Sequence, residues 1–138
     1  PFCRETVSLT DTLRQTGVGV EKITINLENP AQRDQMMQLF SARFPEVSVT
    51  SSRPGNLEIG ATTATKADAM CYLCEKLHIP MERVLACGDS LNDIGMLRTA
   101  GIGVAMGNAE PSARKAAGYC TASNDDDGVA QVIARFVL

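Results

Sequence analysis

The sequence predicts an α/β fold in which the second half of the chain forms a parallel sheet with helices on both faces. Two observations carry this prediction: helical and strand patterns alternate strictly after Thr65, and the strand patterns are short apolar runs such as 84–86. A continuous apolar run indicates a strand that is buried on both faces. We expect helices over 66–77, 92–100, 111–117 and 127–136, and strands over 84–87, 103–106 and 119–121.

The first half of the chain predicts part of a smaller α/β unit. Residues 21–27 alternate between polar and apolar, as in a strand with one solvated face. Asparagine and proline at 29–30 predict the start of a helix that runs to about Phe44. Two short alternating strands follow, at 47–49 and 57–59. The helix is expected to align Met36, Leu39, Phe40 and Arg43 roughly on one face.

The change from this pattern to strict alternation places a domain boundary between residues 1–60 and 61–138. The chain starts within a polar stretch that shows no clear strand or helix pattern, so we expect no element before the first strand. Since Pro1 is not an initiator methionine, the sequence is expected to be part of a longer protein.

Composition and charge argue against several classes of protein. The chain has 138 residues and a net charge of −3, with its basic residues scattered, which argues against nucleic acid or an anionic membrane as the main partner. No apolar run approaches the roughly 18 residues that span a bilayer, and no signal peptide opens the sequence. The five cysteines form no paired framework, which indicates reduced thiols and a cytoplasmic protein.

The most informative stretch is 87–93, Cys-Gly-Asp-Ser-Leu-Asn-Asp, which follows the apolar run at 84–86. Asp89 stands at the carboxyl end of the expected strand, where ligands bind in open α/β sheets. Gly88 permits a tight turn, and the next helix points free N–H groups at the same crevice. This layout indicates a metal and phosphate site, although Asp89 or Ser90 is equally suited to cap that helix.

Two further blocks accompany this stretch. Lys66 opens the helical pattern that precedes it, and Gly-Ile-Gly-Val-Ala-Met-Gly-Asn-Ala at 101–109 follows it as a short strand and turn. In this order the three blocks resemble the haloacid dehalogenase-like superfamily of phosphohydrolases, and within it the Cof-type subfamily. The resemblance extends from 57–59 to 124–129 and concerns the last two motifs of the family.

The resemblance implies a role for each matching residue. Asp89 becomes a direct Mg²⁺ ligand, Asp93 a further acid that holds the metal's waters or orients its neighbours, and Asn92 a phosphate contact. Lys66 neutralises the phosphoryl group and the nucleophile. Mg²⁺ takes oxygen ligands and uses only one or two carboxylates, which suits this set. The loop that contains Asn108 lines the site in the family and has a supporting role.

Two family motifs are not identified in this sequence: the nucleophile motif, and a Ser or Thr at a strand end that binds phosphate. Members carry an early Asp-x-Asp-Gly-Thr, whose first aspartate becomes an aspartyl-phosphate, and this chain has no apolar strand that ends in it. The acidic run at 125–128 is interpreted as a turn and cap for the last helix. Three explanations remain: a fragment of a longer protein, a remnant without chemistry, or a chain that pairs with another chain that supplies the nucleophile. The expected partners are accordingly the missing N-terminal half or a second copy of this chain. Alone, the chain is expected to be inactive.

Other residues are assigned mainly structural roles. Cys71 and Cys74 lie within a helical apolar pattern, which favours core packing over a redox or zinc site. His78, the single histidine, is expected to flank the end of that helix. Arg53 and Asn56 lie in the expected hairpin before the boundary and are candidates for substrate contact. That hairpin resembles the latter part of the family's α/β cap, which closes over the core and selects the substrate.

The sequence thus predicts the C-terminal half of a Mg²⁺-dependent phosphohydrolase that acts on small phosphorylated metabolites. The alternative is a non-catalytic module that binds metal and phosphate or regulates a partner. An upstream Asp-x-Asp-Gly-Thr in the same reading frame would separate the two.

Overall fold

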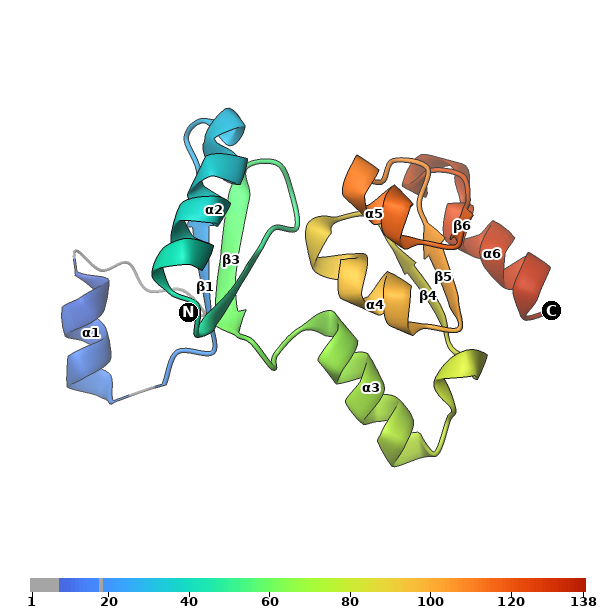
Figure 1. The fold of residues 1–138 in the computed structure, drawn as a ribbon, viewed down its shortest axis with the longest axis horizontal. Coiled ribbons are helices and arrows are strands. Elements are labelled where there is room, and N and C mark those ends of the chain that lie inside the picture. The colour runs from blue at the N-terminus through green and yellow to red at the C-terminus, as the bar shows by residue number, and fades with distance from the viewer. Residues whose placement is uncertain (1–7, 18) are drawn as a thin grey trace.

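The computed structural model describes residues 8–17 and 19–138 and shows a mixed α/β chain with two sheets. Figure 1 shows an antiparallel unit and a parallel unit joined by one linker. The antiparallel unit contains β1 (Lys22–Asn26), a 3-10 turn (Pro30–Gln32), α2 (Arg33–Arg43), β2 (Val47–Thr50) and β3 (Asn56–Ala61). The parallel unit contains α3 (Lys66–Leu77), β4 (Leu85–Gly88), α4 (Ile94–Thr99), β5 (Ile102–Ala105), α5 (Pro111–Ala116), β6 (Tyr119–Cys120) and α6 (Gly128–Phe136).

The antiparallel sheet has the strand order β1-β3-β2 and two chemically different faces. Because successive side chains of a strand point to opposite faces, the pairings Ile25 with Leu57 and Val49 with Ile59 define an apolar face. The pairings Thr24 with Glu58 and Ser48 with Gly60 define a polar one. Figure 1 shows α2 packed along this sheet. Leu57 is fully buried there, so the apolar face forms the core of the unit.

The structure corrects two expectations for the first half. An eight-residue helix, α1 (Leu9–Thr16), occupies the polar stretch that we expected to lack structure. Ser8 caps its start and Gly17, with a φ of 64°, ends it, although the helix buries none of its residues. In α2, Leu39 is 58% exposed, so it does not lie on the buried face with Phe40. The expectation of a longer protein rests on Pro1, which lies outside the described residues.

The second sheet is parallel, as the alternation of helices and strands predicted, and its strand order is β4-β5-β6. Val104 and Ala105 are neighbours in β5 and both are fully buried, so elements cover both faces of this strand. Leu97 from α4 and Ala113 from α5 pack with Ala105 in the main core cluster. In the described part of the chain, β4 pairs with β5 along one edge, and its other edge has no strand partner.

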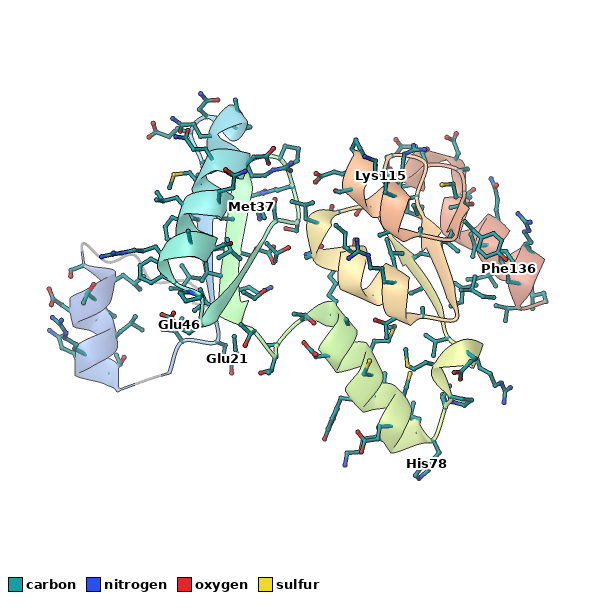
Figure 2. The ribbon with its side chains drawn as sticks, viewed as in Figure 1. Glu21, Met37, Glu46, His78, Lys115 and Phe136 are labelled. Carbon is teal, nitrogen blue, oxygen red and sulfur yellow. The ribbon has the colours of Figure 1, made fainter. Side chains whose placement is uncertain are left out.

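Helix boundaries differ from the sequence prediction mainly beside Asp89. We expected a helix from about residue 92, but a 3-10 turn at Leu91–Asp93 precedes α4. Such turns are frequent at helix N-termini because they tighten the first turn. The expected packing role of Cys74 is borne out, since it is buried in α3. His78 ends α3 with a φ of 55°, and Figure 2 shows it at the end that points away from the antiparallel unit.

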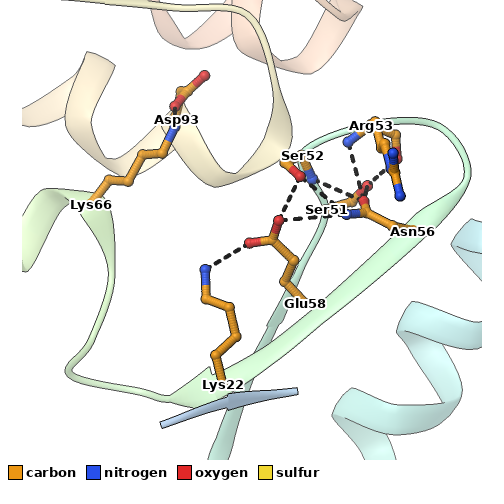
Figure 3. A network of polar contacts seen from close by, with 8 residues as sticks. All are labelled: Lys22, Ser51, Ser52, Arg53, Asn56, Glu58, Lys66 and Asp93. Carbon is orange, nitrogen blue, oxygen red and sulfur yellow. Dashed lines mark hydrogen bonds and ion pairs between the residues drawn. The ribbon is translucent and has the colours of Figure 1, made fainter. Parts of the chain in front are cut away.

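A polar network on the antiparallel sheet fixes its hairpin. Glu58 accepts hydrogen bonds from Ser52 Oγ at 2.5 Å and from Lys22 Nζ at 2.9 Å, as Figure 3 shows. Asn56 Oδ1 accepts bonds from the backbone N–H groups of Ser52 and Arg53, each at 3.2 Å. The hydrogen bond from Ser52, followed by the contribution of Lys22, holds the pKa of Glu58 below its usual value although burial opposes this. The carboxylate is therefore stabilised in its charged form.

Replacement of Gly103 is expected to destabilise the parallel unit. A Cβ at this position would lie 1.9 Å from the Leu97 carbonyl oxygen, so β5 and α4 must move apart. Gly103→Ala should lower the free energy of unfolding by about 2 kcal/mol, measured by urea denaturation and circular dichroism. Gly118→Ala is the matched control, because its nearest neighbour is 4.0 Å away and it should change the value by less than about 0.5 kcal/mol. Equal effects of the two variants would contradict this packing.

The Glu58 carboxylate should make stability depend on pH. A depressed pKa means that its contribution is present above the unfolded value of about 4.3 and is lost as pH falls through the lower folded value. Glu58→Gln should lower the free energy of unfolding by about 1–2 kcal/mol at pH 7. The gap between the variant and the parent should narrow in urea titrations from pH 6 to pH 3. A gap that widens toward acid would contradict the assignment, and the exposed Glu46→Gln is the control.

Candidate functional site

The candidate site is built around Asp93, which lies in the 3-10 turn after β4. Its side chain is 4% exposed, and Oδ2 accepts hydrogen bonds from the backbone N–H groups of Asp89 at 2.9 Å and Ser90 at 3.1 Å. Oδ1 accepts a bond from Lys66 Nζ at 2.5 Å, which Figure 3 shows as the contact between two separate elements. Asp93 therefore joins the start of α3 to the loop at the end of β4.

Local sequence explains how Lys66 reaches this position. Thr65 is the N-cap of α3, and its Oγ1 accepts a hydrogen bond from the backbone N–H of Asp68 at 3.1 Å. The Asp68 carboxylate accepts the backbone N–H of Thr65 in return, also at 3.1 Å. This capping box fixes the first turn of α3 and places Lys66 at its first position.

The charge balance of the site favours an ionised Asp93. Burial alone would raise the pKa of this carboxyl group, but the hydrogen bond from Lys66 and those from the Asp89 and Ser90 backbone lower it. The resulting pKa lies below the usual value for aspartate. Asp93 is therefore an anion at neutral pH and compensates the ammonium of Lys66, whose side chain is 51% exposed.

Asp89 keeps more of its capacity to bind a ligand. Its Oδ1 accepts a hydrogen bond from Ser90 Oγ at 3.1 Å, and its Oδ2 accepts one from Asn108 Nδ2 at 2.9 Å. A carboxylate offers about four lone-pair sites, so about two remain, against about one on Asp93. Asn108 Oδ1 in turn accepts the backbone N–H of Asn124 at 3.1 Å, which fixes the orientation of its amide. These contacts hold the Asp89 carboxylate in one position.

Gly88 is needed for this geometry. A Cβ at residue 88 would lie 2.5 Å from Asp93 Cβ and 2.9 Å from Asp93 Oδ2. Any side chain at residue 88 would therefore displace the carboxylate that accepts the two backbone N–H groups. The neighbouring Cys87 adds no anion, because burial raises the pKa of its thiol.

A cavity of about 450 Å³ lies between the antiparallel unit, mainly the polar face of its sheet, and the starts of α3 and α4. Lys66 and Asn92 line it, whereas Asp89, Asn108 and the hairpin residues that we named as substrate candidates do not. The cavity is bounded on its antiparallel side by Lys22, Met37, Ser48, Val49, Thr50, Glu58, Gly60 and Ala61, and on the other by Ala64, Thr65, Lys66, Ala67, Leu91, Asn92, Ile94, Gly95 and Arg98.

The remaining predicted site residues have structural partners. Arg53 donates to Asn26 Oδ1 at 2.6 Å, and Asn56 is 3% exposed with its amide engaged in the hairpin. Asn92 is different, because its buried Oδ1 has no hydrogen-bond partner among the described residues. Sequence reasoning named Ser90 only as a candidate cap, and it is the N-cap of the 3-10 turn at Leu91–Asp93. It did not predict that Ser90 Oγ contacts both Asp89 and the backbone carbonyl of Ser52, each at 3.1 Å. No local sequence signal indicated that contact across 38 residues.

Several absences hold for the described residues. No three or more histidine, cysteine, aspartate or glutamate side chains gather there in a way that could hold a metal ion by themselves. The cysteines at 71, 74, 87 and 120 are free, while Cys3 lies outside the described part. No described helix is long and apolar enough to cross a membrane.

Comparisons with known proteins identify the family of this chain. A family model of haloacid dehalogenase-like hydrolases matches residues 5–133. The chain is 41% identical over 117 residues to a 5-amino-6-(5-phospho-D-ribitylamino)uracil phosphatase of Bacillus subtilis, covering 85% of this chain and 47% of the relative. It is 42% identical over 82 residues to a phosphoglycolate phosphatase of Methanobrevibacter smithii, covering 59% and 35%.

A solved haloacid dehalogenase-like hydrolase from B. subtilis has a TM-score of 0.74 and 33% identity, covering 86% of this chain and 41% of that one. The chain thus spans about half the length, or less, of the proteins that it matches. The matched residues include β4, the Asp89 loop and Lys66, which form the site described above. The chain therefore belongs to the family of haloacid dehalogenase-like hydrolases.

Proposed function

We propose that this chain is the metal- and lysine-bearing half of a Mg²⁺-dependent phosphohydrolase that forms an aspartyl-phosphate intermediate. The observation that carries the proposal is the contact of Asp93 with both Lys66 and the backbone of the Asp89 loop. Phosphoryl transfer needs positive charge beside the phosphoryl oxygens and a fixed in-line geometry. A single buried carboxylate supports both needs, because it positions a lysine and the metal-binding loop together.

The residues present fit Mg²⁺. Asp89 retains free lone pairs, and the buried Oδ1 of Asn92 has no partner among the described residues, which suits an oxygen-preferring cation. Asp93 would support Asp89 and Asn92 by holding the loop in place, or by accepting a hydrogen bond from a water molecule bound to the metal. When bound, Mg²⁺ would supply positive charge to the phosphoryl oxygens.

The other residues bind and orient the substrate. The Lys66 ammonium neutralises the phosphoryl group, and the Asn92 amide N–H group contacts a phosphoryl oxygen. Asn108 keeps the Asp89 carboxylate in place through its 2.9 Å hydrogen bond. Arg53 and Asn56 lie outside the cavity lining, so their proposed role is to hold the hairpin near the substrate.

We propose that residues 1–60 form the latter part of the cap domain and residues 61–138 half of the hydrolase core. The polar face of the antiparallel sheet would then contact the leaving group across the 450 Å³ cavity, whose size suits a small molecule. The printed names of the relatives include phosphatases of a ribitylaminouracil phosphate and of phosphoglycolate. A small phosphorylated metabolite is the proposed substrate, in the cytoplasm, where free thiols persist.

The nucleophile is proposed to come from a segment outside these 138 residues, or from a second chain. The printed sequence contains no Asp-x-Asp-Gly-Thr, and the chain spans about half of its relatives. Without the nucleophile, the chain should hold metal and phosphate without turning over esters.

Metal binding by the chain itself is expected at Asp89. Mn²⁺, which prefers the same ligands as Mg²⁺, should broaden the amide NMR signals of residues 88–92 at substoichiometric concentration. Asp89→Asn should raise the concentration needed by about tenfold or more. The matched control is Asp125→Asn, which replaces an exposed carboxylate in the 3-10 turn before α6. It should leave the Mn²⁺ titration unchanged. Broadening that persists in Asp89→Asn at the parent concentration would place the metal elsewhere.

A chimera tests catalysis. The half of the Bacillus subtilis relative that this chain does not match should be fused to this chain and assayed with p-nitrophenyl phosphate and Mg²⁺. We expect hydrolysis that Lys66→Met reduces by about 100-fold or more, since it removes charge beside the phosphoryl group. Lys76→Met, at the other end of α3, should leave the rate unchanged.

Two outcomes would overturn the proposal: Mg²⁺-dependent hydrolysis by the 138-residue chain alone, or full activity of the Lys66→Met chimera. An inactive chimera that retains Mn²⁺ binding at Asp89 would favour the alternative function, a module that binds metal and phosphate without catalysis.

A further inference from the structure

The two units contact each other beside Asp89. The Ser51 carbonyl accepts the backbone N–H of Asn92 at 3.2 Å, and the Ser52 carbonyl accepts Ser90 Oγ at 3.1 Å. These two bonds join the β2–β3 hairpin to the turn that follows Asp89. The position of the antiparallel unit is therefore linked directly to the loop that carries the proposed metal ligand.

A second attachment lies at the start of α2. The Arg33 guanidinium binds both carboxylate oxygens of Glu110, with Nη1 at 3.1 Å from Oε1 and Nη2 at 3.0 Å from Oε2. The two side chains are only 16% and 21% exposed. A two-bonded arginine–carboxylate pair that is largely shielded from water is stronger and more directional than an exposed pair. Neither residue lines the cavity or belongs to a predicted site.

Glu110 also contacts the Asp89 loop through its backbone. Its N–H donates to the Asp89 carbonyl at 2.8 Å, and Asn108, two residues earlier, donates to the Asp89 carboxylate. Glu110 thus binds the antiparallel unit with its side chain and the metal-binding loop with its main chain. Glu110 is thus the one residue that links Arg33 to Asp89.

We propose that Arg33 and Glu110 are a positioning pair that keeps the antiparallel unit closed against the Asp89 loop. The inference rests on the proposed function, since the closed unit is the one that would contact the leaving group. When the ion pair is absent, the unit opens about the 61–65 linker, and the Asn92 bond to Ser51 breaks with it. The pair thereby regulates access to the cavity.

Hydrogen exchange of the Asn92 amide measures this opening, because that N–H donates across the boundary between the units. The test uses the 138-residue chain with Arg33→Met, Glu110→Gln and the double variant, followed by NMR. Exchange at Asn92 should become about tenfold faster in each single variant, consistent with loss of a hydrogen bond between charged groups. In the double variant the Asn92 amide should exchange at the same rate as in the single variants, because each single substitution already removes the whole ion pair.

Internal amides separate opening from unfolding. Leu27 donates to the Gly55 carbonyl within the antiparallel unit, and Ile102 donates to the Val84 carbonyl within the parallel unit. Exchange at both should stay within about twofold of the parent. Asp34→Asn is the matched control variant, because it removes the other carboxylate that contacts Arg33, at 3.1 Å, and leaves Glu110 intact. It should leave Asn92 exchange unchanged.

Unchanged exchange at Asn92 in Arg33→Met would overturn the inference. So would equal acceleration at Leu27 and Ile102, which indicates general destabilisation, or additive effects in the double variant, which indicate independent roles. These readouts need no catalysis. Full activity of the Lys66→Met chimera combined with selective acceleration at Asn92 would therefore overturn the proposed function while supporting the positioning pair.

Discussion

The buried carboxylate of Asp93 is the interaction on which the rest of the site depends. An ionised group that is removed from water is costly unless it is paired and hydrogen-bonded, and Asp93 gains three such partners from two elements. The cost of its burial is offset only when α3 and the loop after β4 adopt this arrangement. The absence of a side chain at Gly88 provides the space that it occupies. The chemistry assigned to Lys66 is thus inseparable from the folding of the parallel unit.

The two faces of the antiparallel sheet have different roles in the structure. Its apolar face gains stability from α2 and the buried Leu57, which leaves the polar face unconstrained by core packing. That polar face bounds the cavity, where residues such as Ser48, Thr50 and Glu58 lie opposite the Lys66 and Asn92 side. One face can therefore vary its chemistry without loss of the hydrophobic core. The two-residue period of the strands thus separates the face that forms the core from the face that bounds the cavity.

Local sequence patterns predicted most of the fold, but they could not predict hydrogen bonds between residues that are far apart in the sequence. The parallel unit was predicted well because apolar runs such as 84–86 and the helical patterns between them act over a few residues. Helix α1 was missed because it buries no residue, so its caps at Ser8 and Gly17 had no apolar stripe to support them. The site residues came from a motif resemblance, but the hydrogen-bond partners did not. Arg33 and Glu110 are separated by 77 residues, and nothing in either local sequence indicates the other.

Among the described residues, the outer edge of β4 has no strand partner, and this constrains the geometry of any strand that would pair with it. Neighbouring strands lie about 4.8 Å apart, so a strand that ran parallel to β4 along this edge would end roughly that distance from Gly88. Its main-chain bonds would fix its register, because a shift of one residue turns every side chain to the opposite face. The terminal side chain would then share a single crevice with Asp89. The backbone of Leu85–Gly88 would thereby fix the distance between Gly88 and the end of such a strand.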